Sequence, residues 1–226
     1  MSMLTLRLIE DRLPGGCPAV FLPARPRAIY VRNGGISVEG PQEGRYLASG
    51  QADVSQDETT LLCGSEDSII WRWELSASDQ PEPARLPSAP GTQSTLKLSA
   101  DIELDTEFEW LMRCDRVDFP PGGVALTHVH QGPGIRICLH GEIRIETLGR
   151  VHDHPAGNAW FELGPEPVLA PTTEREPTAF VRCFLLPRAL KGRSSIRYVH
   201  PSDAAAPKVQ QYRVFAERYI DLPECR

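Results

Sequence analysis

Apolar and polar residues alternate in short runs along most of this chain, and Pro and Gly residues separate the runs. Alternation with a period of two is typical of strands that bury one face. The run 209–219 is compatible with a helix or a strand, and no other segment has a clear helical period. The sequence therefore predicts a nearly all-β protein, with candidate strands at residues 28–31, 35–38, 59–63, 68–75, 107–117, 125–130, 135–139, 142–147, 179–186 and 196–199.

The two halves of the chain resemble each other on either side of a predicted linker, residues 78–95, which is rich in Ser, Pro, Gln and Glu. The sequence around Gly34 matches the sequence around Gly141 at an offset of 107 residues. The sequence around Arg72 matches the sequence around Arg182 at an offset of 110 residues. Two matches at nearly one offset predict a duplicated β unit.

The second half contains a His-x-His pair, His128 and His130, shortly after a Pro-Pro-Gly-Gly turn. In a strand both imidazoles project from one face, about 7 Å apart, and can converge on one metal ion. At the offset of 107 residues, the first half carries Phe21 and Pro23 instead, which do not bind metals. The sequence therefore predicts chemistry in the second half alone.

Charge and composition narrow the possible partners. The formal net charge is −6, from 24 basic and 30 acidic residues, and no basic run indicates nucleic acid or phospholipid. No apolar segment approaches the roughly 20 residues of a membrane span, and we expect no membrane partner and a cytoplasmic location. The six cysteines form no Cys-x-x-Cys pair and are expected to be free thiols.

The spacing around the histidines resembles the first motif of the cupins, in which a Gly precedes His-x-His and a Glu and a second Gly follow. Here Gly122 or Gly123 leads into His128 and His130, and Gly141 closes the motif, but Gly134 stands at the Glu position. The chain thus resembles a two-cupin (bicupin) protein, over residues 107–187 and more weakly over 18–76.

The second cupin motif, Pro-x-Gly-x-x-His, is also incomplete. Residues 155–159 match it, but Trp160 occupies the His position. Glu162, two residues further along, would share the face of Trp160 in a strand. His128, His130 and Glu162 would then form a two-His, one-carboxylate set that suits Fe(II), with Mn, Ni or Zn as alternatives. The other interpretation of Glu162 is a solvated acid beside a turn.

Arg136 is a second unusual residue. If Gly134 faces inward, Arg136 and Cys138 share that face, while the alternate positions are uniformly apolar. An inward guanidinium could hold a substrate carboxylate in bidentate geometry. Alternatively, Arg136 pairs with a surface acid.

The resemblance implies an all-β fold of tandem cupin barrels, that is, double-stranded β-helix or jelly-roll barrels, and a homodimer. We expect an N-terminal barrel with its linker at 1–97, a metal-binding barrel at 98–200 and an extension at 201–226. The leading hypothesis is a metal-dependent, dioxygenase-like enzyme that acts on a small carboxylated molecule, with Arg136 and Glu162 as catalytic residues. The alternatives are a small-molecule binding or sensing protein and an isomerase or epimerase.

Overall fold

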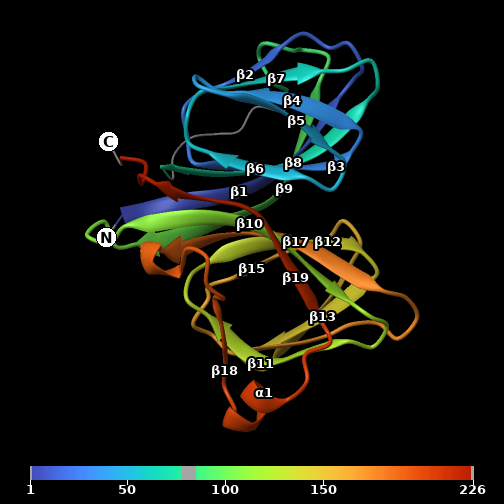
Figure 1. The fold of residues 1–226 in the computed structure, drawn as a ribbon, viewed down its shortest axis with the longest axis vertical. Helices are drawn as coiled ribbons and strands as arrows, with labels where there is room; N and C mark the ends of the chain where they lie inside the picture. Colours follow the sequence, from blue (N-terminus) through green and yellow to red (C-terminus); the bar gives the residue numbers. More distant parts are fainter. Residues whose placement is uncertain (1, 78–84, 225–226) are drawn as a thin grey trace. The chain divides into compact units, whose positions relative to one another are not determined.

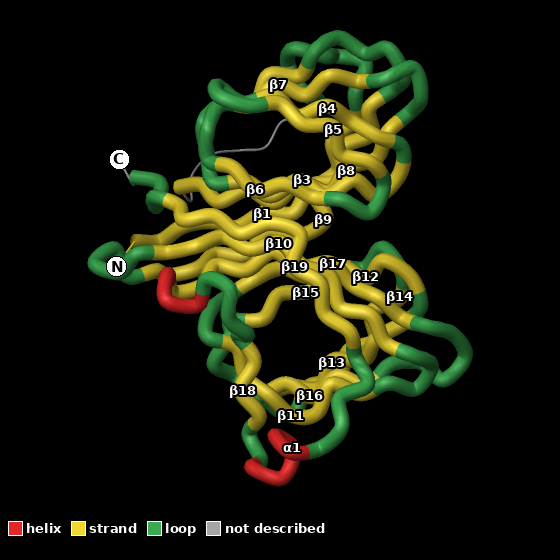
Figure 2. The backbone as a smooth tube through the Cα atoms, viewed as in Figure 1, coloured by secondary structure: helices red, strands yellow, loops and turns green. Residues whose placement is uncertain are grey.

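The structure is a computed structural model that describes residues 2–77 and 85–224. Apart from one α-helix and one 3₁₀-helix, all described elements are strands, which are yellow in Figure 2. The first half contains β1 (Ser2–Leu13), β2 (Val20–Leu22), β3 (Arg27–Asn33), β4 (Gly35–Glu39), β5 (Gly44–Ala48), β6 (Ala52–Ser55), β7 (Thr59–Cys63), β8 (Ser68–Ala77) and β9 (Gln93–Leu104).

The second half continues with strands and two short helical segments. In order these are β10 (Trp110–Phe119), β11 (Val124–His130), β12 (Gly134–His140), β13 (Glu142–Thr147), β14 (Arg150–Pro155), β15 (Ala159–Glu162), β16 (Val168–Pro171), β17 (Thr178–Pro187), η1 (Arg188–Leu190), β18 (Ile196–Tyr198), α1 (Pro201–Ala205) and β19 (Gln211–Ile220). Neither helix has the length and apolar character needed to cross a membrane.

The chain forms two compact units. The N-terminal unit consists of Met1–Met112 and Arg218–Arg226, and the C-terminal unit of Arg113–Glu217. These bounds differ from the predicted domains, because β9 belongs to the N-terminal unit and most of the predicted extension belongs to the C-terminal unit.

Each unit is built from two antiparallel sheets (Figure 1). In the N-terminal unit the strand orders are β6-β3-β8-β1-β9 and β2-β7-β4-β5. In the C-terminal unit they are β15-β12-β17-β10-β19 and β14-β13-β16-β11-β18. The order in one unit repeats that in the other, except that β18 is added beside β11.

The strand registers confirm the duplication that the sequence predicts. Ile29 is paired with Arg72 between β3 and β8, and Arg136 is paired with Arg182 between β12 and β17. These pairs reproduce the offsets of 107 and 110 residues. The turn before β4 also corresponds to the turn before β13, since each contains a glycine with a positive φ, 76° at Gly34 and 73° at Gly141. A Cβ there would collide with Thr178, so the close approach requires glycine.

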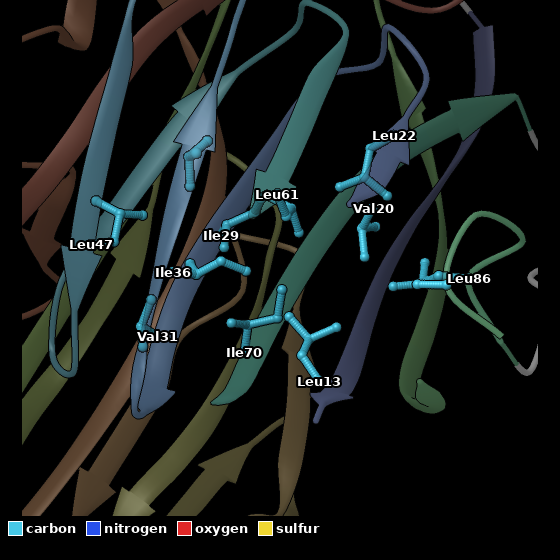
Figure 3. Close-up of a cluster of buried hydrophobic side chains, with 12 residues drawn as sticks. Leu13, Val20, Leu22, Ile29, Val31, Ile36, Leu47, Leu61, Ile70 and Leu86 are labelled. Carbon is cyan, nitrogen blue, oxygen red and sulfur yellow. The ribbon is translucent and has the colours of Figure 1, made fainter. Parts of the chain in front are cut away.

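The interior of the N-terminal unit is filled with aliphatic side chains. In Figure 3, Leu22, Ile36, Leu61 and Ile70 point toward one another from four strands. Each of these side chains is at least 95% buried. A core packed in this way leaves no room for a ligand among these residues.

Eight described strands have no counterpart among the candidate strands: β1, β2, β5, β6, β9, β14, β15 and β16. The run 209–219 is almost entirely the strand β19, which is one of the two structures that the sequence allows for it. In β1, Leu4, Leu6 and Leu8 alternate with Thr5 and Arg7, so its sequence does carry the apolar face of a strand although the candidate strands omit it. The predicted linker 78–95 overlaps the start of β9, and its residues 78–84 lie outside the described residues.

The expectation of free cysteines is wrong for one pair. Cys17 and Cys63 form a disulfide between the segment after β1 and the last residue of β7. Cys114, Cys138 and Cys183 form no disulfide and are buried, as small apolar residues often are.

Candidate functional site

The C-terminal unit contains a cavity of about 200 Å³ where the N-terminal unit has a filled core. Pockets for drug-sized ligands are commonly about 300–1,000 Å³, so this one suits a smaller molecule. Its lining residues come from both sheets and from the segment after β17: Val117, Phe119, Ala125, His128, His130, Ile143, Ile145, Trp160, Glu162, Ala170, Phe180, Arg182, Ser194, Ser195, Ile196, Tyr198, Lys208, Gln210 and Tyr212.

The cavity has an apolar end and a polar end. The apolar end is formed by Phe119, Ala125, Ile143, Ala170 and Phe180, which belong to one buried cluster. The polar end is formed by His128, His130, Glu162, Arg182 and Ser195. Two strands contribute to both ends. β17 places Phe180 at the apolar end and Arg182 at the polar end, and β11 places Ala125 at the apolar end and the two histidines at the polar end.

His128 presents an unprotonated nitrogen to the cavity. Its Nδ1 lies 2.7 Å from the backbone oxygen of Leu126. A carbonyl oxygen only accepts hydrogen bonds, so Nδ1 carries the proton and Nε2 carries the lone pair. Burial lowers the pKa of His128, and this effect outweighs the opposing influence of the Glu162 carboxylate. The ring is therefore a neutral base near pH 7.

His130 uses both of its ring nitrogens within the protein. Nη1 of Arg182 lies 3.4 Å from its Nε2, and Oγ of Ser195 lies 3.3 Å from its Nδ1. A guanidinium only donates, so Nε2 accepts and Nδ1 donates to the serine. Burial, followed by the charges of Arg182 and Arg136, holds the pKa of His130 well below its usual value.

Arg182 carries a fixed positive charge in the cavity wall. Its Nε donates to Oδ1 of Asp115 over 2.6 Å, and its guanidinium lies 4.3 Å from the ring centre of Phe184. The Asp115 side chain is fully buried. Because Asp115 fixes one edge of the guanidinium, Arg182 is preorganised to bind an anionic ligand.

Glu162 and Arg136 face inward, as predicted, but they are paired with each other. Oε2 of Glu162 lies 2.7 Å from Nη2 of Arg136, and its Oε1 accepts a hydrogen bond of 2.8 Å from Nε1 of Trp160. Arg136 is almost completely buried and does not line the cavity. The structure thus brings His128, His130 and Glu162 to one cavity, while Arg136 lies behind Glu162.

This arrangement does not fit a metal ion held by His128, His130 and Glu162. The only free lone pair of His130 faces a guanidinium, and both carboxylate oxygens of Glu162 have protein partners. Within residues 2–77 and 85–224, no group of three or more His, Cys, Asp or Glu side chains is arranged to hold a metal. The expected iron centre is therefore not supported by the donor geometry.

Sequence reasoning missed Arg182, Asp115, Ser195 and Lys208. The ammonium of Lys208 lies 4.0 Å from the ring centre of Tyr198, at an exposed position of the cavity wall. Arg182 had a detectable signal, since it is a charged residue inside an otherwise apolar strand. Asp115 and Ser195 had none, because their partners lie 67 and 65 residues away.

The N-terminal unit lacks this site but keeps its ion pair. Nε of Arg72, the counterpart of Arg182, lies 2.7 Å from a carboxylate oxygen of Asp11. The register places Leu22 at the position of His128 and Ser55 at the position of Glu162. The buried Arg–Asp pair is thus common to both barrels, whereas the cavity and its histidines are confined to one.

Comparison with known proteins identifies the fold. No family model and no curated protein sequence matches the chain. A solved structure of a mutant oxalate decarboxylase from Bacillus subtilis has a TM-score of 0.63 at 12% identity, covering 89% of this chain and 73% of that one. AerE from Microcystis aeruginosa gives a TM-score of 0.56 at 12% identity, with 82% and 88% covered.

A putative glyoxylate-induced protein from Pseudomonas aeruginosa gives a TM-score of 0.53 at 15% identity, covering 80% of this chain and 75% of that one. At such identities the likeness concerns the fold alone. The fold is all-β, with two cupin barrels in tandem, as the resemblance implied.

Proposed function

We propose that the C-terminal unit binds a small organic acid and that His128 transfers a proton at the bound molecule without a metal ion. The supporting observation is the combination of a neutral, buried imidazole and a fixed guanidinium in one cavity of about 200 Å³. This proposal keeps the carboxylated substrate of the leading hypothesis. It replaces the expected dioxygenase chemistry with that of an isomerase or epimerase.

Arg182 supplies the main recognition of the acid. Its charge faces a mostly apolar cavity, where an ionic hydrogen bond is stronger than in water. Lys208 adds a second positive charge at the exposed edge of the cavity wall. This role was expected for Arg136, but Arg136 is paired with Glu162 and does not line the cavity, whereas Arg182 does.

His128 acts as the general base. Nε2 removes a proton from a carbon next to a carbonyl group of the substrate, and the electrons of the C–H bond move to the carbonyl oxygen. Arg182 stabilises the resulting negative charge, and the proton returns from Nε2 to the same carbon or to a neighbouring one. The reaction is redox-neutral and needs no co-reactant.

Proton exchange tests this mechanism directly. Purified protein is incubated with 2-oxo acids such as 2-oxobutanoate in D₂O containing a chelator, and proton NMR follows deuterium incorporation at C3. We expect catalysed exchange that is lost in His128→Gln and retained in His152→Gln, a control on the exposed strand β14. Arg182→Lys, which keeps a positive charge opposite Asp115, should weaken binding without unfolding the protein.

The pH dependence provides a second readout. Because the pKa of His128 lies below the usual value of about 6.5, the base is already unprotonated at pH 7. The exchange rate should be constant from pH 8 to 7 and should fall only at more acidic pH, when Nε2 becomes protonated. A rate that instead falls with rising pH between 7 and 8 contradicts this assignment.

Two other outcomes would identify the remaining hypotheses. Binding of acids without exchange would indicate a binding or sensing protein, which is favoured by the commitment of His130 and Glu162 to protein partners. One equivalent of Fe, Mn, Ni or Zn, lost in both His128→Ala and Glu162→Ala, would restore the metal-dependent enzyme. Elemental analysis of untagged protein distinguishes these cases.

A further inference from the structure

Two alanines create the apolar end of the cavity. The register pairs Ala125 with Ala170 between β11 and β16. At the corresponding positions of the N-terminal unit, Val20 is paired with Leu61 between β2 and β7. Both residues of the second pair are completely buried and belong to the filled core (Figure 3). Two larger side chains thus fill one barrel where two alanines leave space in the other.

The surroundings of Ala125 and Ala170 are apolar. They share a buried cluster with Phe119, Ile143 and Phe180, and the rings of Phe119 and Phe180 lie 6.1 Å apart. A ligand group at this end gains free energy only by burying apolar surface, because a polar group would lose its hydrogen bonds to water.

We infer that the cavity selects an amphipathic organic acid, with its carboxylate at Arg182 and an alkyl or aryl group against Ala125 and Ala170. This inference rests on the proposed function, since the acid end is the one assigned there. Beyond that function, the apolar end of the cavity determines which organic acid is bound. Ala125 and Ala170 are then specificity-determining residues that play no part in the proton transfer.

A series of straight-chain acids from acetate to hexanoate tests the inference by calorimetry. Each methylene buried at the apolar end should increase affinity about fourfold, which corresponds to about 0.8 kcal/mol. The increase should stop when the cavity is full. Ala170→Leu introduces the residue that the N-terminal unit carries at this position. It should abolish the increase and weaken hexanoate much more than acetate.

Leu61→Ala is the matched control. It makes the reverse change in the N-terminal barrel and should leave the whole acid series as in the unmodified protein. Thermal denaturation reports whether each variant is folded. If Ala170→Leu fails to fold, Ala125→Val makes the corresponding smaller change, and it should reduce the affinity of hexanoate more than that of acetate.

The outcomes separate this inference from the proposed function. Acids that bind with an affinity independent of chain length would overturn the apolar-end selectivity and leave the acid site intact. An Ala170→Leu variant that weakens acetate and hexanoate equally would also overturn the selectivity. If no acid binds the unmodified protein, the proposed function itself fails, and the inference fails with it.

Discussion

The side chain of Arg136 illustrates how strongly single residues of the site depend on their partners. It is almost completely buried, and burial lowers its pKa to about 10, against the opposing charge of Glu162. A buried guanidinium that loses its carboxylate still has the unfavourable desolvation free energy, but no longer has the attraction that offsets it. The pair is therefore best tested by removing one partner and then both.

We predict that Glu162→Ser lowers the free energy of unfolding by about 3–5 kcal/mol, because it leaves Arg136 buried without a carboxylate. The double variant Arg136→Ile/Glu162→Ser should recover much of this loss. It reproduces Ile29 and Ser55, the residues at the corresponding positions of the N-terminal unit. Urea denaturation of the single and double variants measures both values, and equal losses would argue against the ion pair.

At the scale of the elements, the two barrels use the same strand order but stabilise it differently. The N-terminal unit combines an aliphatic core with the Cys17–Cys63 disulfide, which closes a separation of 46 residues. A cross-link over such a distance restricts the unfolded chain substantially. The C-terminal unit has no disulfide among its described residues and contains the cavity.

We predict that Cys17→Ser/Cys63→Ser lowers the free energy of unfolding by about 2–4 kcal/mol. Each single variant should cause nearly the whole loss, since either substitution removes the bond. Reduction of the unmodified protein should have a similar effect. Losses of the two single variants that simply add in the double variant would show that the cysteines act independently.

At the scale of the whole molecule, the homodimer remains a prediction from the cupin resemblance. β19 is the last strand of its sheet in the C-terminal unit, and Val214 on this strand is 37% exposed. An unpaired strand edge with exposed apolar residues readily pairs with another chain. We therefore expect β19 to form part of the dimer interface.

We predict that analytical ultracentrifugation at micromolar concentration gives twice the mass of the chain. Val214→Lys should shift the protein toward the monomer, because it places a charge on the strand edge. Arg150→Lys, at an exposed position of β14, provides the control and should not change the mass. A monomer at all concentrations would contradict the prediction.

Local pattern was sufficient to predict the all-β class, the duplication and the inward direction of His128, His130 and Glu162, whereas the tandem cupin barrels were implied by the family resemblance. Each of the first three depends on alternation within a strand or on similarity between segments, and both are properties of neighbouring residues. β1 and β9 carry the same alternation, at Leu4, Leu6 and Leu8 and at Leu96, Leu98 and Ala100, so the pattern is sufficient there as well although the candidate strands omit both.

Only the tertiary structure decided what these side chains do, because their chemistry depends on partners far away in the chain. Asp115 fixes Arg182 across 67 residues, and Arg182 then occupies the nitrogen of His130 that a metal would need. The space at Ala125 likewise depends on the pairing of Ala125 with Ala170, which lies on another strand. The sequence by itself determined that His128, His130 and Glu162 face the barrel interior, whereas strand pairing determined which side chains they meet.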